Sequence, residues 1–85
     1  MITIRDQIKN LLQSYSTDEV ARFIYDNMTM SYIKDLVSLS KDLDLSEEKK
    51  ILSEIKYVLS CIKEDKECDK IKEALVMQTF RRNVT

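Results

Sequence analysis

Apolar side chains recur along the start of the chain at the three- and four-residue spacing of an α-helix. The first series is Ile4, Ile8, Leu11, Leu12 and Tyr15. Because this spacing places one stripe on a helical surface, it predicts a helix over about residues 3–15. Thr3 is the expected N-cap, and Asp6 lies in the first turn, where an acid complements the helix dipole.

Ser16 and Glu19 mark the start of a second helix. They stand three residues apart as a capping box, and Tyr15 and Val20 flank them at the positions of a hydrophobic staple. The pattern therefore predicts a helix that begins at about residue 17. Its inward face is expected to carry Val20, Phe23, Ile24 and Met28.

Polar residues interrupt this second stripe. Asn27, Thr29 and Ser31 all compete for backbone hydrogen bonds as caps, so the chain is expected to turn there. A third helix is predicted over about residues 30–42. Its apolar face is expected to comprise Ile33, Leu36, Val37 and Leu43 or Ser40.

The fourth predicted helix is the most regular one. Asp44 or Ser46 is its expected N-cap, and Glu47 and Glu48 complement the positive end of its dipole. Its apolar residues are Ile51, Leu52, Ile55, Val58, Leu59 and Ile62. This unbroken stripe predicts that the fourth helix is the central strut of the fold.

Residues 63–73 carry four lysines and five acids, and the apolar period fails there. We expect a break near residues 65–69, with Asp69 capping a fifth helix over about residues 70–81. One long continuous helix is the alternative, because neither Gly nor Pro stops it. Either way the pattern predicts an all-α fold, a compact bundle of four to five short helices in a single domain over residues 1–85.

The composition excludes several kinds of chemistry. The chain has no Gly and no Pro, which disfavours β hairpins and glycine-rich phosphate loops. It has no His, so the usual acid–base and nucleophilic triads lack their imidazole. Cys61 and Cys68 are interpreted as reduced thiols, and a metal site would need two more soft ligands. We therefore expect a protein that is not an enzyme and that binds no cofactor and no metal.

The charge pattern indicates a cytoplasmic protein. Arg5, Asp6 and Lys9 interrupt any apolar run that could serve as a signal peptide or membrane span. The chain has 14 basic and 15 acidic side chains, so its net charge of −1 gives little repulsion between copies. Its composition, rich in Ile, Lys and Asp and without Trp, is typical of small proteins of phages or mobile elements.

The predicted fifth helix, over about residues 70–81, holds more apolar residues than one inward stripe explains. Its predicted stripe is Ile71, Ala74, Leu75 and Gln78. Val76, Met77 and Phe80 lie roughly 100–200° around the helix from Leu75. We expect these three residues, with Arg81 and Arg82, to form a partner interface, since aromatic and arginine side chains commonly dominate binding energy.

A second apolar surplus lies where the second and third helices meet. It comprises Tyr25, Met28, Met30 and Tyr32. Met adapts its shape and Tyr combines apolar area with a hydroxyl, so these residues suit either a core corner or an interface. The sequence therefore predicts a non-enzymatic interaction module, a small regulatory or accessory protein that binds a protein partner or itself as a homo-oligomer.

The alternative function is nucleic-acid binding through Lys70, Lys72, Arg81 and Arg82. Asp69 and Glu73 accompany these basic residues, and no aromatic residue interleaves them for base stacking, which weighs against this alternative. Attachment to a membrane surface is disfavoured as well, because two arginines at one helix end do not make a basic face.

Overall fold

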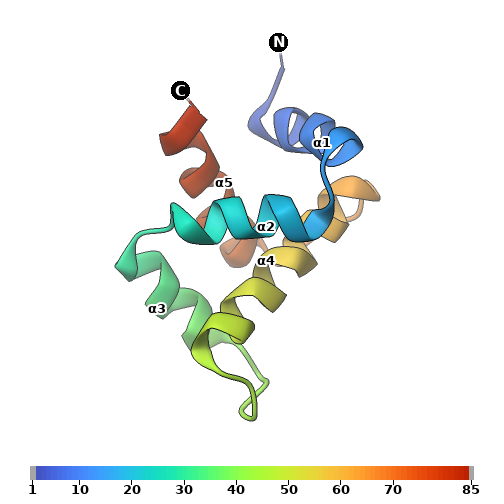
Figure 1. Ribbon diagram of the computed structural model, residues 1–85. Helices are drawn as coiled ribbons and strands as arrows, with labels where there is room; N and C mark the ends of the chain where they lie inside the picture. Colours follow the sequence, from blue (N-terminus) through green and yellow to red (C-terminus); the bar gives the residue numbers. More distant parts are fainter. Residues whose placement is uncertain (1, 85) are drawn as a thin grey trace.

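Five α-helices, each started by a cap in the sequence, make up the fold (Figure 1). The computed structural model describes residues 2–84. The helices are α1 (Ile4–Ser14), α2 (Thr17–Asp26), α3 (Met30–Leu39), α4 (Glu47–Lys63) and α5 (Lys70–Val84). No strand occurs within this described stretch, and the predicted all-α bundle is confirmed.

Short polar side chains fix the start of every helix. The hydroxyls of Thr3, Ser16, Thr29 and Ser46 each accept a hydrogen bond from the backbone N–H three residues later. At α5, the Asp69 carboxylate accepts from the N–H groups of Ile71 and Lys72, at 3.0 and 3.1 Å. These bonds satisfy donors that the helix itself leaves unpaired.

The predicted break between α4 and α5 is confirmed, and one left-handed residue produces it. Asp65 has φ 54°, and the N–H of Lys66 donates to the carbonyl of Cys61 at 2.8 Å. The N–H of Asp65 donates to the carbonyl of Ile62 at 3.3 Å. Together these bonds form a Schellman motif, which ends a helix and reverses the chain. The alternative prediction of one continuous helix is therefore wrong.

The helix α4 is the central strut, as predicted, and contacts each of the other four helices. In Figure 1, α2 crosses over α4, while α3 packs toward the opposite end of α4 from α1. The fully buried large side chains are Ile8, Ile24, Leu36, Ile51, Ile55, Val58, Leu59, Ile62, Val76 and Thr79. The helices α1, α2, α3 and α5 thus enclose one core around α4.

The third helix is shorter than predicted, because Ser40 takes an extended conformation and its N–H bonds back to the carbonyl of Val37 at 3.1 Å. Leu43 therefore lies beyond the helix and is 85% exposed, so its predicted place on the inward face is wrong.

The inward face of α5 also differs from the prediction. Ile71 is 60% exposed, whereas Val76 and Phe80 are 0% and 2% exposed. The buried face is centred roughly 120° around the helix from the predicted stripe. The reason is that α5 contacts α1, α2, α3 and α4 and so is buried on more than one side.

Candidate functional site

The residues predicted as an interface on α5 do not form one exposed surface. Val76 and Phe80 lie in the core, so their assignment to an interface is wrong: packing against the other helices covers them. Met77 is half-buried against the core. Arg81 and Arg82 are exposed near the end of α5.

The second predicted group, around the junction of α2 and α3, is divided in the same way. Met28 is buried, so its place in an interface is wrong too, and it closes the corner of the core. Tyr25 and Tyr32 are half-buried against the core, and the Tyr32 hydroxyl donates to Gln78 Oε1 on α5 at 2.5 Å. Only Met30, 65% exposed, is largely open to solvent.

The basic residues considered for nucleic-acid binding are separated by their contacts. Lys72 Nζ lies 2.5 Å from Glu54 Oε2, and the two side chains are 17% and 13% exposed. The same ammonium lies over the Tyr57 ring, 5.4 Å from its centroid. The hydrogen bond with Glu54 raises the pKa of Lys72. Lys72 is therefore engaged within the chain, while Lys70 is exposed.

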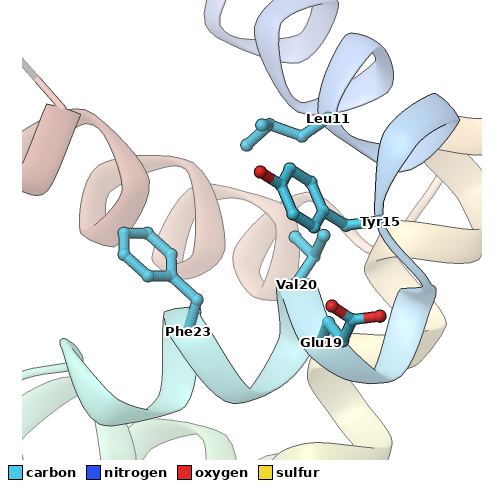
Figure 2. Close-up of a pocket in the computed structure, with 5 residues that line it drawn as sticks. All are labelled: Leu11, Tyr15, Glu19, Val20 and Phe23. Atoms are coloured by element: carbon cyan, nitrogen blue, oxygen red, sulfur yellow. The ribbon is translucent and has the colours of Figure 1, made fainter.

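An apolar groove lies instead between α1 and α2, with a volume of about 390 Å³ (Figure 2). It is lined by Leu11, Tyr15, Glu19, Val20 and Phe23. Val20 is 4% exposed and forms the floor. In Figure 2 the Tyr15 ring, at the end of α1, lies beside Val20, and the Phe23 ring projects from α2 farther along, apart from both; Tyr15 and Phe23 are 53% and 41% exposed. The groove therefore offers an aromatic ring on each rim.

The corner between the helices builds this groove. Tyr15 is extended (φ −125°, ψ 150°), and Ser16 follows it as the N-cap of α2, so two residues make the whole connection. The Ser16 hydroxyl accepts from the N–H of Glu19 at 3.1 Å, and Glu19 Oε1 accepts from Ser16 Oγ at 3.1 Å. This capping box holds the two helices in a fixed relation, and the groove lies in the angle between them.

The lining of the groove is suited to binding an apolar group. Glu19 carries the one charge among its described lining residues, and that carboxylate is held by the cap. The remaining lining side chains present hydrocarbon and aromatic surface, on which burial of a partner side chain is favourable. The groove can therefore bind an apolar side chain or group of another molecule.

The apolar pattern predicted that Phe23 and Tyr15 both face inward, and the structure exposes both of them. In α2 the buried positions are Val20, Ala21 and Ile24. Phe23 lies roughly 105° from the centre of that face. Counting Ala21 as a core position would have turned the predicted face and exposed Phe23. A small side chain carries little weight in an apolar pattern, so the signal was weak.

Replacing Ser16 with alanine is expected to lower the free energy of unfolding by about 1 kcal/mol, because the first turn of α2 loses its cap. Urea unfolding followed by far-UV circular dichroism measures this loss. Ser38→Ala is the control, since the hydroxyl of Ser38 bonds only to a nearby carbonyl on the exposed side of α3. Equal stability of both variants would contradict the role of the capping box.

Two further observations limit the kind of site. Within residues 2–84, no helix is both long enough and apolar enough to cross a membrane. In the same stretch, no three His, Cys, Asp or Glu side chains gather as metal ligands would.

Comparison with known proteins finds no matching family model, no similar curated protein and no similar solved structure. The groove between α1 and α2 is therefore the candidate binding site.

Proposed function

We propose that this chain is a protein-interaction module that pairs with a second copy of itself through the groove between α1 and α2. The observation that carries the proposal is an apolar hollow with the exposed rings of Tyr15 and Phe23 on its two rims. Aromatic side chains that fill pockets commonly supply most of the binding energy of an interface.

A second copy fits because the projecting group and the hollow lie on the same face. A two-fold axis brings the same patch of both copies together, so a patch must complement itself. In such a pair, Phe23 of each copy enters the hollow over Val20 of the other copy. Leu43 and Ile71 are also exposed, but neither of them lines this groove.

Charge and size are compatible with self-association. The net charge of −1 gives little repulsion between copies. The domain exposes 5608 Å², and a standard interface covers about 800 Å² of each partner, roughly one seventh of that surface. A domain of this length buries a modest share of its surface alone, so shared burial adds to its stability.

Phe23→Ala is expected to weaken the dimer by roughly 10³-fold, because each dimer loses two rings worth about 2 kcal/mol each. Sedimentation equilibrium over a concentration series from micromolar to millimolar measures the dissociation constant. Circular dichroism verifies that the variant remains helical.

Ile71→Ala is the matched control, since it removes an exposed apolar side chain outside the groove. We expect this variant to dimerise like the unchanged chain. A chain that is monomeric at every concentration contradicts the proposal, and so does a dimer that Phe23→Ala leaves intact.

A further inference from the structure

Glu19 brings a negative charge to the apolar groove, and the basic side chains near this turn of α2 are bound elsewhere. Its carboxylate is exposed and forms no salt bridge in the described part of the chain. Arg22, one turn farther along α2, pairs with Glu48 on α4. Lys56 of α4 pairs with Asp18 at 2.7 Å. The charge of Glu19 is therefore not neutralised by a cation of the same copy.

The capping box holds this carboxylate at the groove. The hydroxyl and the backbone N–H of Ser16 donate to Glu19 Oε1, at 3.1 and 3.5 Å. Both donors are neutral, so they orient the carboxylate and leave its charge in place. In Figure 2 Glu19 lies next to Val20 on the first turns of α2. Tyr15 on α1 is the other titratable side chain of the described lining, to which α3, α4 and α5 contribute no residue.

The proposed pair encloses the carboxylate of each copy. When Phe23 of each copy lies over Val20 of the other, the two copies of α2 run in opposite directions across the two-fold axis. The two Glu19 positions are then offset by about five residues, or roughly 7 Å along the helix. This offset is close to the Debye length of about 8 Å at physiological salt, so repulsion between the two charges is only partly screened. The entering ring also displaces water from the carboxylate beside Val20.

We propose, on the basis of the self-association proposed above, that Glu19 makes this pairing depend on pH. Each copy takes up one proton from solvent at the Glu19 carboxylate when the pair forms. Loss of water and a nearby like charge both disfavour the ionised form of a carboxyl group, so the protonated form is favoured in the pair. In the separate chain the carboxylate is exposed to water. Because pairing binds protons, a lower pH strengthens the dimer and a higher pH weakens it.

The test measures the dimer dissociation constant of the full chain by sedimentation equilibrium over a range of pH. We expect the constant to fall by about fivefold from about pH 7.5 to about pH 5. Glu19→Gln keeps an oxygen that accepts from Ser16 and removes the charge. This variant is expected to pair about tenfold more tightly at neutral pH and to lose most of the pH dependence. Circular dichroism verifies that it remains helical.

Asp18→Asn is the matched control, because it removes the same charge from the same turn of α2. Asp18 does not line the groove, and its side chain is 78% exposed. We expect this variant to keep the pH dependence of the unchanged chain.

The outcomes separate this proposal from self-association itself. A dimer that Phe23→Ala weakens, but that neither pH nor Glu19→Gln alters, overturns the role of Glu19 alone. Equal effects of Glu19→Gln and Asp18→Asn overturn it as well, since the response then follows net charge. A chain that is monomeric at every pH and concentration overturns both proposals.

Discussion

Phe80→Ala is expected to lower the free energy of unfolding by about 3–5 kcal/mol, a large share of the stability of a small domain. Phe80 is 2% exposed and packs in the core, so its removal leaves a cavity among side chains that relax only in part. Urea unfolding followed by far-UV circular dichroism measures the loss. A variant that is largely unfolded in water is an equally clear positive result.

Phe23→Ala is the matched control for that experiment, since it removes the same side chain from a position that is 41% exposed. At concentrations where the chain is monomeric, we expect this change to cost no more than about 1 kcal/mol. Equal losses for the two variants would contradict the division between a core ring and a surface ring. A Phe80→Ala chain that stays as stable as the unchanged one would contradict the packing of α5.

Arg5→Met is expected to lower the free energy of unfolding by about 2–3 kcal/mol, because Arg5 joins three parts of the chain. Its Nη1 lies 3.2 Å from Glu73 Oε1 on α5. Its Nη2 donates to the carbonyls of Lys66 and Cys61, at 2.7 and 3.4 Å. The bonds fix α1 on the turn between α4 and α5. Methionine keeps the apolar stem and removes the charged donors.

Arg22→Met provides the comparison for Arg5. Arg22 pairs with Glu48 and with Asp26, but its side chain is 53% exposed, and exposed ion pairs contribute little to stability. We expect a small change at Arg22 and a large one at Arg5 in the same urea titration. The reverse order would contradict the role of Arg5 as a tie between helices.

The starts of the helices were predictable because N-caps act locally. Ser16 and Glu19 lie three residues apart in sequence, and their capping box forms whatever packs on the helix afterwards. The same holds for Asp69, whose carboxylate binds the first N–H groups of α5. The reversal at Asp65 was located in sequence by the loss of apolar period, although no glycine marks it.

The faces of α2 and α5 were not predictable to the same degree, because they depend on the arrangement of the other helices. Phe80 follows no single stripe, and it is buried since α5 packs against all four neighbours. Phe23 continues the apolar pattern of α2, yet the angle between α1 and α2 leaves it at the rim of the groove. The candidate site is thus a product of helix packing, which spacing along one helix does not contain.

Contacts between copies can be observed directly by isotope-filtered nuclear Overhauser spectroscopy on a mixture of labelled and unlabelled chains. Self-association through the groove predicts contacts between the Phe23 ring of one copy and Leu11, Tyr15 or Val20 of the other. Contacts between copies confined to Met30, Leu43 or Ile71, or none at millimolar concentration, would contradict the account.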